Sequence, residues 1–401
     1  REEFIMLQNK FPNVRFSKYL DIWKTTKLNR IAEIIGGGTP DTKQLSYWNG
    51  GINWFSPTEV GKTVYLTKSE KTISQLGLQK SSAKLLPAFK TILFTSRAGI
   101  GDVGILTEES ATNQGFQSLV VNEGTDVYFL YSYSDKIKKY ALKHSAGSTF
   151  LEISGKELGK MDLSIPSLQE QTAIGSLFRT LDDLLASYKD NLTNYQSLKA
   201  TMLSKMFPKS GQTVPEIRLD GFEGEWEEKK FSKLVKRVTQ SSDSDSLPKV
   251  EFEDIISGQG RLNKDISSKF DNRKGIHFKP GYTLYGKLRP YLNNWLLPKF
   301  EGVALGDFWV FDPNGNDSNF IYYLIQSNRY QKVANDTSGT KMPRSDWKSV
   351  SSTIFAIPQT IAEQQAIGDY FSNLDNLINS HQEKISQLET LKKKLLQDMF
   401  I

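Results

Sequence analysis

The stretch Glu-Gln-Thr-Ala-Ile-Gly-Ser-Leu-Phe at residues 170–178 returns as Glu-Gln-Gln-Ala-Ile-Gly-Asp-Tyr-Phe at residues 363–371. Each copy follows an Ile-Pro pair and continues into Leu-Asp, Leu-Lys and finally Met-Phe pairs, the last at residues 206–207 and 399–400. From the Glu-Gln pair to the Met-Phe pair, the offset between the copies is 193 residues throughout. A register kept over so long a stretch indicates an internal duplication, and this duplication decides the fold.

A second echo marks the start of each half. Three residues recur at an offset of 203, namely Pro12, Arg15 and Trp23 as Pro215, Arg218 and Trp226. The halves therefore cover residues 12–207 and 215–400, joined by a Pro- and Gly-containing stretch at 208–224. Their middles are much less alike than their ends. Similar frames around dissimilar centres predict one scaffold that carries two different recognition regions.

Each repeat continues as a series of heptads. With Ile174 at position a, leucine, isoleucine or a ring-bearing side chain occupies nearly every a position, and leucine is frequent at d. The a residues are Ile174, Leu181, Tyr188, Tyr195 and Met202, then Ile367, Leu374, His381, Leu388 and Leu395, with Leu177, Leu184, Leu198, Tyr370, Leu377 and Leu391 at d. Phe178, Leu185, Leu192, Phe371, Ile378 and Ile385 widen the two stripes. Such heptads favour coiled-coil packing.

We expect the two helices to pair antiparallel, because two repeats related by a pseudo-twofold axis then bury both stripes at once. Each helix would be about 55–60 Å long at 1.5 Å per residue. Asn191 and Lys384 occupy the d position of the same heptad, where a polar residue typically sets register and orientation. The alternative is that each helix packs only on its own domain. Helices of this length outreach either middle, which favours the pair.

The expected fold class is α+β, with two tandem mixed α/β recognition domains, each followed by a long helix. We expect a lead-in at 1–27, a first recognition domain at 28–164, a first helix at 165–207, a linker with a second lead-in at 208–230, a second recognition domain at 231–356 and a second helix at 357–401. Many short strands are predicted in both middles.

Polar and cationic side chains follow predicted strands in both middles. The strand at 91–94 leads into a Ser-Arg pair, and its counterpart at 282–285 leads into a Lys-Leu-Arg-Pro-Tyr run. Arg and Lys bind phosphates and guanine, and side-chain amides pair with adenine. The candidate DNA-binding residues are Thr39, Ser96, Arg97, Asn113, Gln114, Lys287, Arg289, Tyr291, Lys341, Arg344 and Ser345.

Composition narrows the function classes. The net charge is +6, and because the two heptad stretches sum to −1, the other residues carry +7, which indicates a polyanionic partner. Cysteine is absent and the three histidines are dispersed, which argues against thiolate or histidine metal sites and Ser-His-Asp triads. With no run of eighteen apolar residues and no signal peptide, we expect a cytoplasmic protein without a membrane span.

Two glycine-rich motifs do not fit nucleotide binding. Residues 99–104 match the G-x-G-x-x-G pattern, but no amphipathic helix follows to present its N-terminus to a pyrophosphate. The Gly-Gly-Gly-Thr-Pro stretch at 36–40 lacks the Gly-Lys-Ser/Thr of a P-loop. The sequence also lacks the Asn-Pro-Pro-aromatic motif of amino-methyltransferases and an Asp…Glu-x-Lys nuclease cluster. We therefore expect no catalytic residue, no metal ligand and no cofactor in this chain.

The duplicated frame resembles the specificity subunit of type I restriction–modification systems. The resemblance rests on the Pro…Arg…Trp lead-in, the Ile-Pro…Glu-Gln…Ile-Gly…Phe…Leu-Asp helix ending in Met-Phe, and phrases at 36–40, 95–98, 112–116, 287–291 and 339–347. One departure is that residues 149–151 read Thr-Phe-Leu where the second half has Lys-Met-Pro-Arg at 341–344. If that Lys and Arg bind DNA, the first half must use other residues.

The resemblance implies that each domain reads one half of a bipartite site in double-stranded DNA. It further implies that the paired helices fix the spacing and dock two modification subunits, which supply S-adenosylmethionine and adenine methylation. Restriction subunits, with Mg and ATP, would translocate and cleave. The residues expected in the coiled coil or in partner docking are Ile174, Leu181, Tyr188, Leu198, Ile367, Leu374, His381 and Leu388.

Two other classes stay open at this point. One is a self-sufficient DNA methyltransferase or nuclease, against which the missing motifs argue. The other is a coiled-coil scaffold whose basic loops bind RNA or protein.

Overall fold

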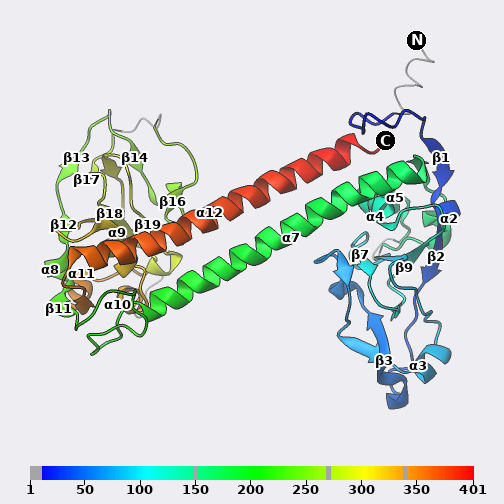
Figure 1. Cartoon of the computed structure of the whole chain (residues 1–401), viewed down its shortest axis with the longest axis horizontal. Helices are drawn as coiled ribbons and strands as arrows, with labels where there is room; N and C mark the ends of the chain where they lie inside the picture. The colour runs from blue at the N-terminus through cyan, green and yellow to red at the C-terminus, as the bar shows by residue number, and fades with distance from the viewer. Residues whose placement is uncertain (1–10, 148–150, 268–271, 337–341) are drawn as a thin grey trace, which may run out of the picture. The chain divides into compact units, whose positions relative to one another are not determined.

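A computed structural model describes residues 11–147, 151–267, 272–336 and 342–401 (Figure 1). The chain divides into two compact units, the first made of residues 1–189 and 384–401 and the second of residues 190–383. Two 38-residue helices, α7 (Leu168–Lys205) and α12 (Ile361–Asp398), each contribute one part to either unit. Of the predicted site residues, Lys341 lies outside the described ranges, as do residues 148–150.

The first unit is built on a sheet with the strand order β2-β9-β6-β7-β4. Its strands are β2 (Ala32–Gly36), β4 (Tyr65–Leu66), β6 (Thr91–Phe94), β7 (Val103–Leu106) and β9 (Gln117–Val121). A second sheet has the order β5-β3-β8, formed by β3 (Trp48–Phe55), β5 (Lys71–Ile73) and β8 (Ser110–Thr112). The helices of this domain are α2 (Leu28–Ile31), α3 (Gln75–Gln79), α4 (Val127–Ser132), α5 (Ser134–His144) and α6 (Gly155–Leu158).

The second unit contains two four-stranded sheets, with orders β12-β21-β18-β19 and β13-β17-β20-β14. The first comprises β12 (Lys236–Val238), β18 (Thr283–Gly286), β19 (Trp295–Leu296) and β21 (Phe308–Asp312), and the second β13 (Ser241–Ser242), β14 (Lys249–Val250), β17 (Gly275–Phe278) and β20 (Gly302–Ala304). A small hairpin joins β15 (Ile255–Ile256) to β16 (Arg261–Leu262). The helices are α8 (Phe231–Leu234), α9 (Ser318–Leu324), α10 (Asn328–Ala334) and α11 (Trp347–Ser352).

The same frame closes each recognition domain. In the first unit, β1 (Lys24–Lys27) pairs antiparallel with β10 (Asp162–Ile165), and in the second, β11 (Glu227–Lys230) pairs antiparallel with β22 (Ile354–Ile357). The strand that follows the lead-in thus meets the strand that precedes the long helix. Both units are mixed α/β domains, which confirms the predicted fold class.

The repeated Arg, Trp and Glu of the frame bind one another. Arg15 donates from Nε to Oε1 and from Nη2 to Oε2 of Glu170, both at 2.7 Å. The Trp23 indole N–H donates to Oε1 of the same carboxylate at 3.4 Å. Arg218, Trp226 and Glu363 repeat these contacts in the second unit, at 2.7 Å, 2.8 Å and 3.1 Å. Because the glutamates are almost fully buried, each needs this paired arginine to offset its desolvation.

The helices α7 and α12 pack antiparallel, as predicted. In the first unit, Lys392 forms an ion pair with Asp182, which also accepts a hydrogen bond from the Tyr128 hydroxyl at 2.7 Å. The second unit repeats this set, because Lys199 lies 2.7 Å from Asp375, which accepts from the Tyr323 hydroxyl at 2.9 Å. The aspartate of each repeated Leu-Asp pair therefore binds the lysine of the Leu-Lys pair in the other copy. The alternative in which each helix packs only on its own domain is excluded.

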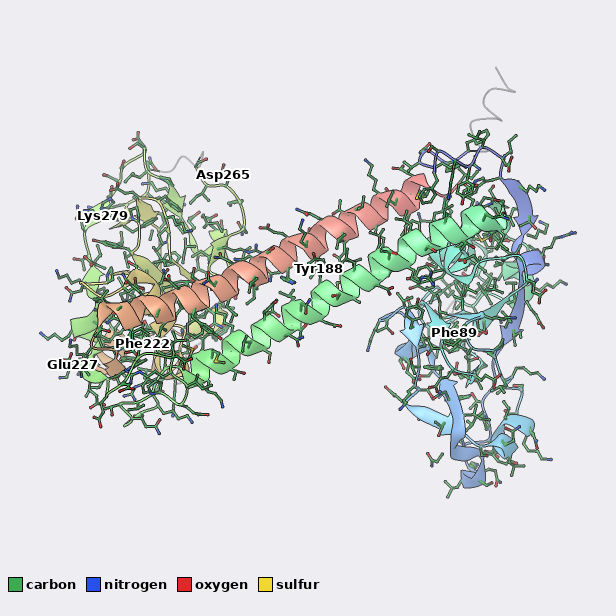
Figure 2. The ribbon with its side chains drawn as sticks, in the orientation of Figure 1. Phe89, Tyr188, Phe222, Glu227, Asp265 and Lys279 are labelled. Atoms are coloured by element: carbon green, nitrogen blue, oxygen red, sulfur yellow. The ribbon has the colours of Figure 1, made fainter. Side chains whose placement is uncertain are left out.

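The buried seam differs from the predicted heptad phase. The a residues near the start of each helix are buried, namely Ile174, Leu181, Ile367 and Leu374, whereas the later a residues are half-buried. A second buried row consists of residues such as Phe178, Leu185 and Ile378 at position e. Four of the five d-position leucines are exposed instead, among them Leu198 at 37%, whereas Leu177 is half-buried and packs on the core of the first unit. Asn191 and Lys384 are exposed as well, so they do not interrupt the seam. Tyr188, near the middle of α7, is half-buried (Figure 2).

The reason for the phase is that the helix ends also belong to the cores of the recognition domains. Ile174 and Phe178 are part of the main core of the first unit, together with residues of α4 and α5. In the second unit, Ile367 and Phe371 pack in the same way against α9. These domain contacts decide which side of a wide apolar stripe turns inward.

Each Met-Phe pair ends its helix inside a hydrophobic core. Phe400, 4% exposed, packs on Phe129, Tyr133 and Phe178 of the first unit, with ring centroids 5.5, 4.7 and 5.7 Å away. Phe207 lies 5.8 Å from Phe320 in the core of the second unit. The Met-Phe pair that follows α12 therefore completes the core of the first recognition domain, and the pair that follows α7 completes that of the second.

Candidate nucleic-acid interface

Three loop segments of the first unit meet where β6 ends. The backbone N–H of Ser96 donates to the Gly115 carbonyl at 2.8 Å, and the N–H of Ile153 donates to the Ser96 carbonyl at 3.1 Å. Arg97 forms a backbone bridge with Glu152. The residues after β6 thus lie between the loop that precedes β9 and the segment that precedes α6.

The glycine-rich turn at 36–40 joins this group through a close backbone approach. The N–H of Gly38 donates to the Thr112 carbonyl at 2.8 Å. A Cβ on Gly37 would lie 1.9 Å from the Asn113 carbonyl oxygen, so this position requires glycine. The Thr39 hydroxyl is consequently held against the Gln114 side chain, to which it is hydrogen-bonded. The structure therefore brings together the five residues predicted for the first half.

These five residues differ in what they can contact. Thr39 and Gln114 are exposed, and Arg97 and Asn113 are half-buried. The Asn113 side-chain oxygen accepts from the Gly115 N–H at 2.8 Å, which fixes this amide group within the loop. Ser96 is fully buried and its hydroxyl has no hydrogen-bond partner within the described residues, so the prediction that it touches DNA does not fit this position.

The second unit forms the same loop cluster with different side chains. The N–H of Lys287 donates to the Asp307 carbonyl at 2.9 Å, the N–H of Ser345 donates to the Lys287 carbonyl at 2.9 Å, and Leu288 bridges to Arg344. These contacts match those of the first unit one for one. They place Lys287, Asp307, Arg344 and Ser345 where the first unit has Ser96, Gly115, Glu152 and Ile153.

An acidic residue that the sequence analysis missed organises the cations here. The Asp307 carboxylate accepts from Arg344 Nη2 at 2.9 Å and from Nε at 3.3 Å, and the Lys287 ammonium lies 3.6 Å away. The hydrogen bond from Arg344 holds the pKa of Asp307 below its usual value, so this carboxylate stays ionised. The sequence does not show that Asp307 lies beside Lys287 and Arg344, because the three residues come from separate segments that only the fold brings together.

The other predicted residues of the second half are divided. Arg289 is exposed, and Tyr291 is 58% exposed, so both are accessible. Ser345 is 6% exposed and its hydroxyl donates to the Ala334 carbonyl at 2.8 Å, which is a structural role.

The loop after the central strand has a left-handed residue in both units. Ala98 has φ 51° and Arg289 has φ 48°, each one residue beyond the bridging residue. Non-glycine residues in this conformation are strained and occur often at functional sites. Because Ala98 corresponds to Arg289, Arg97 lies one position earlier in its loop than Arg289 does.

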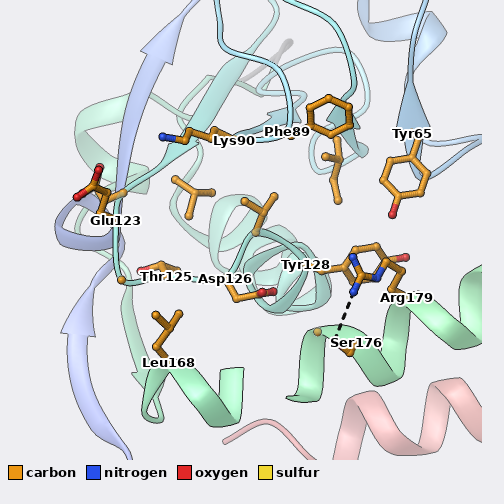
Figure 3. A pocket seen from close by; sticks show the side chains of 16 residues that line it. Tyr65, Phe89, Lys90, Glu123, Thr125, Asp126, Tyr128, Leu168, Ser176 and Arg179 are labelled. Carbon is orange, nitrogen blue, oxygen red and sulfur yellow. Dashed lines mark hydrogen bonds between the residues drawn. The ribbon is translucent and has the colours of Figure 1, made fainter. Parts of the chain in front are cut away.

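A cavity of about 460 Å³ lies elsewhere on the first unit, where α7 meets the loop before α4 (Figure 3). Its lining includes Tyr65, Phe89, Tyr128, Leu168 and Arg179, and none of the predicted DNA-binding residues. Phe89 is 64% exposed and has φ 57°. The sequence analysis did not find this cavity, because its walls come from five separate segments.

Two further patterns concern the described residues only. No helix among them is long and apolar enough to cross a membrane, and no group of three His, Cys, Asp or Glu side chains is placed to hold a metal ion. The sequence analysis expected no helix after the G-x-G-x-x-G stretch at 99–104, and this stretch leads into strand β7.

The duplicated frame matches a known family twice. The model of the type I restriction modification DNA specificity domain matches residues 21–195 and again residues 226–390. The chain belongs to this family. The two matches cover both recognition domains and most of each long helix of this family member, and their boundaries follow the internal repeat.

Several relatives of this specificity-family chain support the assignment. The type I restriction enzyme MjaIX specificity subunit of Methanocaldococcus jannaschii is 25% identical over 417 aligned residues, covering 97% of this chain and 95% of the relative. The EcoR124I/EcoR124II specificity subunit of Escherichia coli is 30% identical over 179 residues, covering 42% and 43%. The crystal structure of an S subunit from M. genitalium covers 98% of this chain and 99% of its own, with a TM-score of 0.62 at 13% identity, and so shares the fold.

Proposed function

We propose that this chain is the DNA sequence-specificity subunit of a type I restriction–modification system and reads an asymmetric bipartite site in duplex DNA. The observation that carries the proposal is the pair of equivalent loop clusters, one on each unit, which share their backbone contacts but differ in side chains. Phosphate contacts would give affinity that depends on salt, and the loop side chains would give base choice.

The asymmetry of the site follows from particular residues. At equivalent positions the first unit has Ser96, Gly115 and Glu152, and the second has Lys287, Asp307 and Arg344. A carboxylate accepts hydrogen bonds from base amino groups, whereas a guanidinium donates to guanine. Glu152 and Arg344, both exposed at equivalent positions, therefore favour different bases.

The long helices offer repeated surfaces for two copies of one partner. Exposed apolar side chains on α7 recur on α12 at the repeat offset, namely Leu168, Leu184 and Leu198 with Ile361, Leu377 and Leu391. Each is 37–46% exposed. Apolar side chains at equivalent repeat positions suit two identical subunits, and we assign this surface to two modification subunits. Leu168 also lines the cavity of the first unit.

Catalysis would then reside on the partners. In this proposal the modification subunits bind S-adenosylmethionine and methylate adenine, and the restriction subunits use Mg and ATP. The support is membership of a specificity family and the likeness over nearly the whole length to a named specificity subunit.

The test is selection of binding sites from random duplex DNA by the full chain, alone and with its modification subunits. We expect two short conserved blocks separated by a gap of fixed length, and weaker binding at higher salt. Competition with RNA of equal length separates the DNA reader from a scaffold that binds RNA. Selection of no duplex sequence, or stronger binding to RNA, would contradict the proposal.

A further inference from the structure

Arg344 is held so that part of its guanidinium stays available. Asp307 occupies the side of the group that carries Nε and Nη2, with both carboxylate oxygens engaged. A guanidinium has five N–H donors, and this side-on pair uses two of them. The donors that remain are the two N–H groups of Nη1 and one N–H group of Nη2. The outer edge of the guanidinium, formed by Nη1 and Nη2, is the edge that matches O6 and N7 of guanine in the major groove.

The side chain of Arg344 is also accessible while its partner is partly sheltered. The exposed fraction of the side chain is 51% for Arg344 and 28% for Asp307. A bidentate carboxylate restricts the rotation of the arginine, so less conformational entropy is lost when the outer edge binds a ligand.

The charges beside Arg344 are largely paired. A hollow of about 370 Å³ opens beside Asp307 and is lined by Glu251, Glu253 and Arg273, among others, and Arg273 forms an ion pair with Glu251. Asp307 in turn is shared by Arg344 and Lys287. The geometry of the free guanidinium edge, rather than the local charge, therefore favours a base edge as the partner of Arg344.

We propose that Arg344, positioned by Asp307, reads a guanine in the half-site bound by the second unit. The inference rests on the proposed function and names one base within it. Glu152 stands at the equivalent position of the first unit, beside Gly115 where the second unit has Asp307. The first unit therefore has no arginine at the position of Arg344, and this particular contact belongs to the half-site of the second unit.

The experiment is site selection with the full chain, followed by affinity measurements on the selected duplex. We expect Arg344→Ala to remove the preference at a single guanine, lowering the discrimination at that position by about 5- to 150-fold. Arg344→Lys keeps the charge but loses the bidentate edge, so it should lose the preference while the slope of affinity against salt stays as in the unmutated chain. Lys279→Ala, an exposed cation outside the loop cluster, is the matched control.

Two further readouts separate reading from a structural effect. Replacing the selected guanine by 7-deazaguanine, which lacks the N7 acceptor, should weaken binding by the unmutated chain and leave Arg344→Ala unaffected. Asp307→Ala should reduce the guanine preference, because it frees the arginine to rotate without removing it.

The outcomes distinguish the two proposals. If the unmutated chain selects a bipartite site but Arg344→Ala and Arg344→Lys keep every base preference, the guanine assignment is wrong and the proposed function stands. If the unmutated chain selects no duplex sequence, the proposed function itself fails.

Discussion

Removing the Phe400 ring should strongly destabilise the first recognition domain, although this residue is next to last in the given sequence. Phe400 is 4% exposed and contacts three aromatic rings, those of Phe129, Tyr133 and Phe178. Phe→Ala changes in a packed core destabilise by about 3–5 kcal/mol, from lost transfer energy and the cavity left behind. That is a large part of the roughly 5–15 kcal/mol that holds a domain folded.

Amide hydrogen exchange measures this effect unit by unit. For Phe400→Ala we expect protection in β6 and β9 to fall on the order of 10² to 10⁴-fold, while β18 and β21 keep theirs. Phe207→Ala is the matched variant, because the same side chain ends α7 in the core of the second unit. It should reverse the pattern. If Phe400→Ala lowers protection equally in both units or in neither, then the C-terminal segment does not complete the first core and the reasoning is refuted.

Three further predictions concern the frame. Gly175→Ala places a Cβ 2.4 Å from Asp126 Oδ1 and 3.0 Å from a backbone nitrogen, so it should lower the free energy of unfolding by roughly 1–3 kcal/mol in urea titration, whereas Gly51→Ala, which meets no atom within 4 Å, should have little effect. In a double-mutant cycle, Asp182→Asn and Lys392→Met should show a coupling of roughly 1–2 kcal/mol, and additive effects would argue against the cross-helix ion pair. Burial raises the pKa of Tyr285 to about 12, so the folded state holds its proton longer than the unfolded state. The stabilisation from this group is complete below pH 10 and falls as pH rises toward 12, by about 1.4 kcal/mol per pH unit. Between pH 10 and 12, the denaturation midpoint of Tyr285→Phe should therefore fall less steeply with pH than that of the unmutated chain. Parallel curves for the two proteins would contradict the assignment.

The loop clusters illustrate how far residue patterns reach toward the site. Strand ends followed by Arg, Lys and amide side chains predicted the candidate segments, and the structure gathers those of each half within its own unit. Ser96 and Ser345 were predicted as contacts but are buried, because exposure depends on segments that return from elsewhere in the chain. Asp307 and Glu152 were missed for the same reason, since nothing in their local sequence marks them as neighbours of the loop after the central strand.

The sequence by itself determined the duplication, the two mixed α/β domains and the antiparallel pair of long helices, because these follow from local periodicity and from a repeat that keeps its register. Only the tertiary structure decided which rows of the apolar stripe are buried. Positions a, d and e are mostly apolar, and the choice between d and e depends on the domain cores against which the helix ends pack. The insertion of each Met-Phe pair into a core distant in sequence, and the hold of Asp307 on Arg344, likewise come from packing between segments that no local pattern connects.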